Sequence, residues 1–231
     1  MSLNTFMVRL QIILALLLSA GTICYYICIP DMGKLDDFLS DIRYKPNYIA
    51  PDHIPNHVKL AFIAAEDNFF YSHHGVDYKA LSRATYMYLS TGKKKQGGST
   101  ITMQLARNVY LTKQKTFFRK FKEILIAFKI EHHFSKDDIL ALYLNKIYFG
   151  HNTHGIQQAA QYYFAKKVPK LTRSEAVTLA VIPPAPSQVT PILTPDKIIK
   201  KRNLILKRLL GLRAISLEAY DQAILAPVTQ N

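Results

Sequence analysis

The chain has 231 residues, which suits one ordinary domain with a short appendage and leaves little room for a second full catalytic domain. Apolar residues make up 49% of it and glycine numbers only nine, so disorder and low complexity are poor interpretations. Thirty Lys and Arg against 16 Asp and Glu give a formal charge of +14, which favours a partner that carries phosphate groups. Nucleic acid, anionic lipid, a pyrophosphate substrate and a merely basic surface all remain open.

The N-terminal part of the chain has the pattern of a membrane segment. Residues 10–29 carry no charge, and their number matches the roughly 20 residues that cross a bilayer as a helix. Arg9 precedes this stretch and mostly acidic residues follow it, so residues 1–9 are expected in the cytoplasm and the main domain outside. A cleaved signal peptide is the alternative, with small residues Ser19 and Gly21 near its end.

The rest of the chain divides into a lead-in and a domain. Residues 30–55 contain four prolines and mixed charges, and are interpreted as a stalk rather than packed core. Over residues 56–225 apolar side chains recur mostly at helical spacing, which predicts an all-α domain. Helices are expected at 56–66, 78–88, 99–109, 116–134, 136–147, 156–164, 174–182 and 196–209. Side chains placed to cap such helices are those of Asn56, Thr116, Ser135 and Thr172.

An acidic and aromatic segment ends the first helix of this domain. Residues 66–75 read E-D-N-F-F-Y-S-H-H-G. Aromatic neighbours can exclude water from a carboxylate and raise its pKa, which suits a general base. The alternative is a helix end with its acids in solvent, although acids there interact unfavourably with the helix dipole.

A second segment joins a basic run to glycines and hydroxyls. Residues 93–102 read K-K-K-Q-G-G-S-T-I-T, and amides and hydroxyls at such a helix start can hold phosphate oxygens. The spacing is not that of a P-loop, so an ordinary capped helix is an equal alternative. Basic residues follow at Arg107, Lys115, Arg119, Lys120 and Lys122. The face opposite this basic cluster is expected to bury Phe117, Phe121, Ile124 and Phe128.

Metal and covalent chemistry have weaker candidates. The histidine candidates are the adjacent pairs at 73–74 and 132–133, together with His151 and His154. Adjacent residues on a helix point to different faces, so a zinc site is not expected. Both cysteines, Cys24 and Cys28, lie in the apolar N-terminal stretch, and no G-x-S-x-G elbow is present. The domain therefore shows no obvious nucleophile.

Taken in order, these segments resemble the peptidoglycan glycosyltransferase family, which comprises polymerase domains of bifunctional penicillin-binding proteins and monofunctional transglycosylases. Residues 66–75 are similar to the motif E-D-x-x-F-x-x-H-x-G, and residues 97–104 to G-G-S-T-I-T-Q-Q with Met103 in place of one glutamine. Three further motifs are matched at residues 119–123, 136–150 and 155–186. The resemblance covers roughly residues 50–225, and its first two motifs are long and specific.

The resemblance implies a lysozyme-like helical fold and an inverting transfer reaction. Glu66 would deprotonate the 4-hydroxyl of an acceptor sugar, which attacks C1 of the growing lipid-linked chain and releases undecaprenyl pyrophosphate. Glu123 matches a second essential acid, which would orient the basic cluster or help to hold Mg²⁺ or Mn²⁺; no cofactor is otherwise required. The resemblance assigns substrate binding to Asp67, His73, Ser99, Thr100, Gln104, Arg107, Lys115 and Arg119.

The same resemblance implies a place and partners. The expected partners are lipid II, the growing lipid-linked glycan, the membrane and other cell-wall synthesis or division proteins, but no nucleic acid. The protein would be a single-pass protein of the cytoplasmic membrane with its catalytic domain on the periplasmic side. The apolar pairs at residues 110–111 and 117–118 would dip into the outer leaflet.

Two other functions are kept as alternatives. A lytic transglycosylase or muramidase also uses a lysozyme-like helical fold with one key Glu. Such an enzyme has no need of a basic cluster for pyrophosphate, so synthesis is favoured. A catalytically inactive scaffold that binds lipid precursors is disfavoured because Glu66 and Glu123 are both present.

Overall fold

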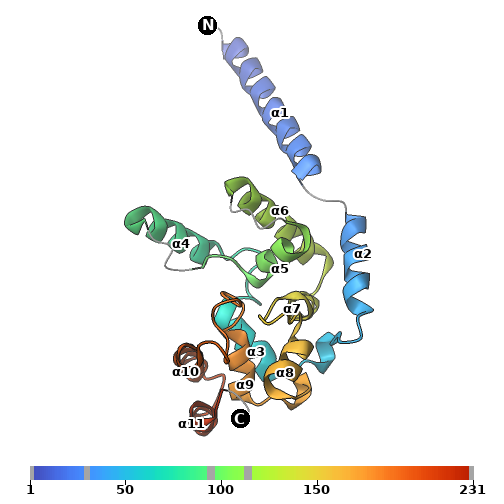
Figure 1. Ribbon diagram of the computed structural model, residues 1–231. Coiled ribbons are helices and arrows are strands. Elements are labelled where there is room, and N and C mark those ends of the chain that lie inside the picture. The colour runs from blue at the N-terminus through green and yellow to red at the C-terminus, as the bar shows by residue number, and fades with distance from the viewer. Residues whose placement is uncertain (1–2, 29–31, 93–96, 112–115, 229–231) are drawn as a thin grey trace.

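The computed structural model describes residues 3–28, 32–92, 97–111 and 116–228. Within these ranges the elements are helices, and the one strand-like pairing is an isolated antiparallel bridge between Tyr148 and His154. The prediction of a mainly helical domain is confirmed, while the lysozyme-like arrangement stays a prediction. In chain order (Figure 1) the elements are α1 (Leu3–Cys28), α2 (Met32–Arg43), η1 (Pro51–His53), α3 (Asn56–Glu66), α4 (Tyr78–Thr91), α5 (Ile101–Tyr110), α6 (Phe117–His133), α7 (Lys136–Lys146), α8 (Ile156–Phe164), η2 (Val168–Lys170), α9 (Arg173–Ala180), α10 (Pro195–Gly211) and α11 (Leu217–Leu225).

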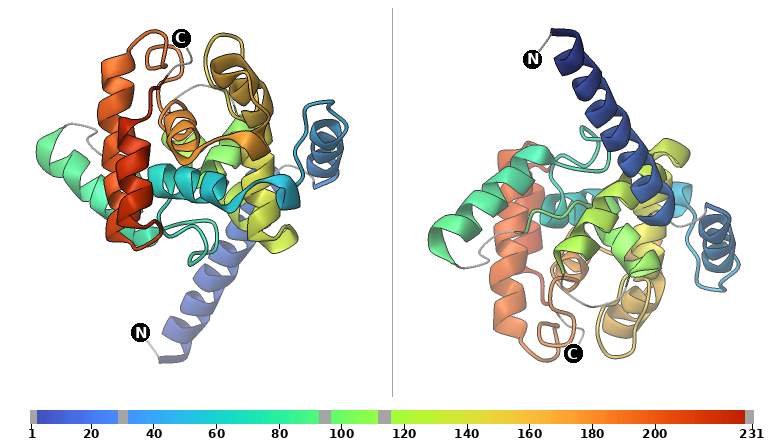
Figure 2. Two further views of the ribbon diagram at one scale, coloured as in Figure 1. Left: turned by 90° about the horizontal axis from the view of Figure 1, so that it is seen from below. Right: turned by 90° about the horizontal axis from the view of Figure 1, so that it is seen from above.

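Helix α3 crosses the middle of the domain, and its last residue begins the first motif (Figure 2, left). It packs against α9 and α10 on one side, while α5 packs against α6 and α7. Phe62 of α3 is fully buried and meets Phe149 edge-on, with ring centroids 6.1 Å apart. Because α3 is anchored along its length by such contacts, its C-terminal residue, Glu66, is held in a fixed position.

The helix starts follow the capping side chains closely. Thr116 and Ser135 accept hydrogen bonds from the amides of Arg119 and Asp138, and Thr172 forms a full capping box with Glu175, as expected. The prediction for Asn56 was wrong: α3 begins directly after Pro55, and Asn56 is already helical without a side-chain cap. Helices α2 and α11 were not predicted.

The interpretation of residues 30–55 as unpacked lead-in needs correction. This segment contains α2 and η1, and Ile42, Ile49 and Ile54 are buried in the core. Asn145 of α7 fixes it in place: its side chain accepts from the Ile49 amide at 2.9 Å and donates to the Ile49 carbonyl at 2.8 Å. Pro46 lies in a turn and Pro51 begins η1, and the short elements α2 and η1 both pack on α7.

Helix α1 extends away from the other helices on the side of α6 (Figure 1). Its apolar side chains are exposed, Leu14 and Leu18 among them. Across the portion of the chain that is described, no helix combines the length and apolarity needed to span a membrane. The predicted span of residues 10–29 ends at Ile29, which lies outside the described residues.

Arg202 of α10 holds the C-terminal part of the domain together. Its side chain is 1% exposed and donates to the Ser174 hydroxyl at 3.1 Å and to the carbonyls of Ile224 and Ala226 at 2.8 and 2.5 Å. Replacing Arg202 by Met leaves these buried acceptors without donors.

We expect Arg202→Met to lower the free energy of unfolding by roughly 2–4 kcal/mol, measured by urea denaturation followed by circular dichroism. Lys200→Met, at an exposed position of the same helix, is the control. Equal stability of the two variants would contradict the structural role of Arg202.

Candidate active site

Glu66 is the last residue of α3, and its side chain is partly enclosed. Burial raises the pKa of its carboxyl group, while the hydrogen bond from Gln104 and the charge of Arg107 partly oppose that rise. The Gln104 amide nitrogen donates to one carboxylate oxygen at 2.8 Å. Glu66 is therefore a carboxylate whose proton affinity is increased by its surroundings and whose orientation is fixed.

Gln104 is itself held by a buried tyrosine. The Tyr143 hydroxyl donates to the Gln104 carbonyl oxygen at 3.4 Å, and the Tyr143 side chain is fully buried. Burial, then the nearby charge of Glu66, places the pKa of Tyr143 well above its usual value, so it remains a hydrogen-bond donor. Tyr143 of α7 thus turns the amide group of Gln104 toward Glu66.

Asp67 lines the same cavity as Glu66 and links the two motif segments. Its carboxylate accepts from the backbone amide of Ile101, at the start of α5, at 2.9 Å. It also lies 2.9 Å from His73 Nε2, and the side chains of both are almost fully buried. The first motif is therefore tied to the helix start of the second, which fixes Glu66 relative to α5.

Thr100 strengthens the same junction. Its hydroxyl donates to the Gly75 carbonyl at 2.6 Å and accepts from the Met103 amide at 3.1 Å, so it both caps α5 and holds the end of the first motif. Met103 is completely buried against α6, so this position serves packing. The resemblance assigned Asp67, His73 and Thr100 to substrate binding, and this stays a prediction: the three side chains bond within the protein, while Asp67 and Thr100 also line the cavity at Glu66.

The basic cluster of α6 is organised around Glu123. This carboxylate is 1% exposed and accepts hydrogen bonds from Arg119 and from Lys120, the latter at 3.0 Å. Lys120 also donates to the Ser99 hydroxyl at 2.7 Å, which connects the cluster to the second motif. Burial and the neighbouring charge of Arg107 lower the pKa of Arg119, so cations of α5 and α6 converge here. Lys115 lies outside the described residues.

The burial predicted for one face of α6 was wrong for Phe121 and Phe128, which are 46% and 37% exposed. Ile124 is partly buried against Met103 and Ala127 as predicted, and the Phe117 side chain lies outside what the structure describes. The buried face instead holds Glu123, Ile126, Ala127 and Ile130. Because Glu123 is neutralised by two cations, its burial is tolerated, and the helix turns its aromatic residues outward.

A cavity of about 360 Å³ lies beside Glu66. Ser99 and the two glycines before it form one wall. A Cβ atom on Gly98 would lie 3.1 Å from Ala84 Cβ of α4, so a glycine suits this close approach. Arg83 of α4 and Arg208 of α10 also line the cavity, and sequence reasoning did not identify either. The Arg208 guanidinium donates to the Ala64 carbonyl at 2.6 Å, a contact between distant parts of the chain that no local motif reveals.

The described residues bring no three His, Cys, Asp or Glu side chains together as a metal site. Glu123 was the candidate ligand, and each of its oxygens already accepts a hydrogen bond from a cationic side chain. A divalent ion at this carboxylate stays a prediction, and it would share the Glu123 oxygens with Arg119 and Lys120.

Comparison with known proteins identifies the family. Residues 36–210 match the model of the family described as transglycosylase. Penicillin-binding protein 1F of Bacillus subtilis is 52% identical over 158 residues, which are 68% of this chain and 22% of that protein. A protein of Cupriavidus necator whose name describes a transglycosylase is 43% identical over 192 residues, 83% of each chain.

Among solved structures, that of penicillin-binding protein 1A from Haemophilus influenzae matches with 29% identity and a TM-score of 0.39. The match covers 57% of this chain and 16% of that one. The chain thus spans about a quarter or less of the penicillin-binding proteins described here. From the family match and the relative of similar length, the chain belongs to the transglycosylase family.

Proposed function

We propose that this protein is a peptidoglycan glycosyltransferase that polymerises lipid II into glycan strands and releases undecaprenyl pyrophosphate. The observation that carries this proposal is the pairing of a desolvated carboxylate, Glu66, with a separate cluster of cations around Glu123. The carboxylate can act as a general base, and the cations can stabilise the negative charge of a departing pyrophosphate. Family membership supports the reaction class.

Glu66 acts as the general base in this account. Its carboxylate takes the proton of the acceptor 4-hydroxyl, and the resulting oxygen attacks C1 of the donor sugar from the face opposite the leaving group. The bond from C1 to the pyrophosphate oxygen breaks, its electron pair stays on pyrophosphate, and the anomeric centre inverts. A base with increased proton affinity is suited to this transfer, and the hydrogen bond from Gln104 fixes the Glu66 carboxylate beside the cavity.

The cations supply the second half of the reaction. Charge accumulates on the pyrophosphate as it departs, and fixed guanidinium and ammonium groups stabilise that charge without reorganising. Arg107 lies close enough for its charge to lower the pKa of Arg119. A bound anion would relieve the repulsion between these two cations. Glu123 orients Arg119 and Lys120 from behind. We derive no step through a metal ion.

The cation cluster also separates synthesis from glycan cleavage. A hydrolase acting on a neutral glycosidic bond protonates its leaving group and needs no array of cations. Here cations converge beside the second motif, and Lys120 connects them to Ser99 in the wall of the cavity. We therefore place synthesis ahead of the lytic alternative.

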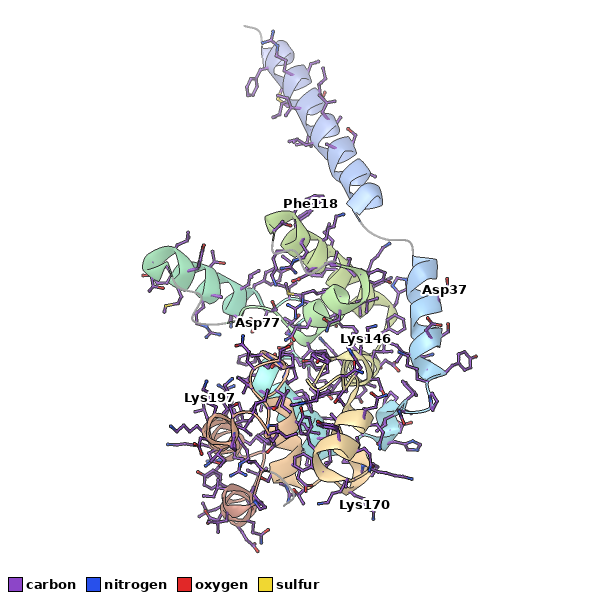
Figure 3. The ribbon with its side chains drawn as sticks, viewed as in Figure 1. Asp37, Asp77, Phe118, Lys146, Lys170 and Lys197 are labelled. Carbon is purple, nitrogen blue, oxygen red and sulfur yellow. The ribbon has the colours of Figure 1, made fainter. Side chains whose placement is uncertain are left out.

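A membrane location follows from the lipid-linked substrate. The exposed aromatic residues of α6, the exposed Tyr86 and Leu89 of α4, and the apolar side chains of α1 would contact lipid. Figure 3 shows Phe118 at the end of α6 nearest to α1. We propose attachment to the cytoplasmic membrane through this side, with the domain in the periplasm. Contacts with cell-wall synthesis or division proteins remain part of the proposal.

The pH dependence of polymerisation tests the assignment of the base. Because the pKa of Glu66 is raised and only the ionised form accepts a proton, we expect kcat/KM to rise as pH increases through that raised pKa. Gln104→Ala removes a hydrogen bond that stabilises the carboxylate, so the rise should move to higher pH. Initial rates of strand formation from lipid II between pH 4.5 and 8 would measure both. A rise that stays at the same pH in Gln104→Ala would argue against Glu66 as the titrating base.

A further inference from the structure

A second recess lies on α8 and the loop before it, and shares no residue with the cavity at Glu66. This groove has a volume of about 570 Å³. Amide side chains dominate its lining, together with a stacked pair of rings, and Lys167 is its one lysine or arginine. On a chain with 30 Lys and Arg, a groove so rich in neutral hydrogen-bonding groups is unusual.

An aromatic platform forms one part of the groove. The Tyr162 ring is 50% exposed and stacks on His151, with centroids 5.5 Å apart and planes at 23°. Tyr163 meets Tyr162 edge-on at 5.0 Å, and its own hydroxyl donates to the Phe149 carbonyl at 2.7 Å. His151 has a φ of +47°, an unfavourable value for a non-glycine residue, which brings its ring over Tyr162. The platform is therefore fixed before any ligand arrives.

The amide groups beside it are partly fixed as well. The Gln157 side-chain oxygen accepts from the Val168 amide at 3.2 Å, and that of Gln158 accepts from the His154 amide at 3.3 Å. With their oxygens engaged by the backbone, these glutamines have amino groups left to donate. Gln161 lies on the same helix and lines the groove with them. The surface thus offers several donors next to a flat ring.

We propose that this groove binds the glycan strand of peptidoglycan as a site separate from the catalytic cavity. The weakly positive C–H face of a sugar ring packs on the face of an aromatic ring, and acetamido and hydroxyl groups pair with side-chain amides. A neutral amide lining suits a ligand that is polar and largely uncharged. The identity of the sugar rests on the proposed function.

The groove continues into a second hollow of about 150 Å³, and Asn47 and Gln158 line both. This extension suits a polymer of several sugars. It adds Lys45 and Lys146, whose cations would face the carboxylates of the stem peptides that such a strand carries. Burial and the charge of Lys45 lower the pKa of Lys146, while the charge of Asp41 partly opposes that change.

The position of the groove is consistent with this ligand. Helix α8 lies at the end of the domain away from α1 (Figure 1), and Lys170, shortly after it in the chain, lies far from Phe118 (Figure 3). If α1 marks the membrane side, the groove faces the cell wall. There it would hold nascent or existing strands.

The test is titration calorimetry of the full-length protein in detergent with a tetrasaccharide of alternating N-acetylglucosamine and N-acetylmuramic acid. We expect wild type to bind, and Tyr162→Ala to weaken binding by at least about tenfold because the stacking platform is lost. Gln161→Ala, at an exposed position, should weaken it less, and Tyr162→Phe should retain it. Tyr88→Ala removes a tyrosine of similar exposure from α4, 53% against 50% for Tyr162, and should have no effect.

Three results would overturn the groove site: no binding by wild type, equal binding by folded Tyr162→Ala and Gln161→Ala, or loss of binding in Arg83→Ala, which alters the wall of the cavity at Glu66 and would place the sugar there. The groove and the proposed reaction can fail independently. Binding of the tetrasaccharide without any polymerisation of lipid II would contradict the proposed reaction. Polymerisation without binding of the tetrasaccharide would contradict the groove site.

Discussion

Glu66→Gln is expected to lower the rate of lipid II polymerisation by about 10² to 10⁴, the usual contribution of a general base. Glutamine keeps the size of the side chain and can still pair with Gln104, so the cavity should keep its shape. What is lost is the ability to accept a proton. The effect should therefore fall on kcat, with little change in KM, in a continuous assay with fluorescent lipid II.

The matched control is Glu218→Gln, the same chemical change at an exposed position of α11. Its rate should equal that of wild type. Glu66→Gln that retained more than a tenth of the wild-type kcat would exclude Glu66 as the base. Matching unfolding curves of the two variants would show that Glu66→Gln loses activity without losing its folded structure.

Arg119→Ala is expected to reduce kcat/KM by about 10²-fold, because one fixed cation would be missing where charge develops on the pyrophosphate. Among the described residues, it would also leave Lys120 as the remaining cation that pairs with the buried carboxylate of Glu123. Arg119→Lys restores a charge but not the planar pair of donors, so it should recover part of the activity.

Lys170→Ala removes the same charge from the far end of the domain (Figure 3) and should leave the rate unchanged. This control separates a local effect from a general loss of positive potential. Equal losses in Arg119→Ala and Lys170→Ala would mean that overall charge, and not the cluster around Glu123, determines the rate.

Most of the fold could be predicted because hydrophobic spacing and capping side chains act locally. The helix from Ile156 to Phe164 has the predicted limits, and Thr116, Ser135 and Thr172 mark three other starts. Helix α2 was not predicted because the prolines near it indicated an extended lead-in. The segment is instead held by tertiary contacts, among them the hydrogen bonds between Asn145 and Ile49.

The site was harder to predict, since side chains of the same motif have different tasks. Glu66 and Asp67 border the same cavity, but the Asp67 carboxylate also holds the start of α5, and residue type alone does not reveal this second task. Arg208 reaches the cavity from α10, far along the chain, and Tyr143 acts through Gln104. The orientation of α6 depended on burying a neutralised Glu123, which apolar periodicity does not detect.

The central claim is that Glu66 drives synthesis of glycan, and the most direct measurement is the product itself. Purified full-length protein would be incubated with fluorescent lipid II, and separately with preformed glycan, and the products separated by gel electrophoresis. We expect long strands from lipid II with wild type and none with Glu66→Gln, with preformed glycan left intact. Cleavage of preformed glycan without any polymer from lipid II would contradict it and establish the lytic alternative.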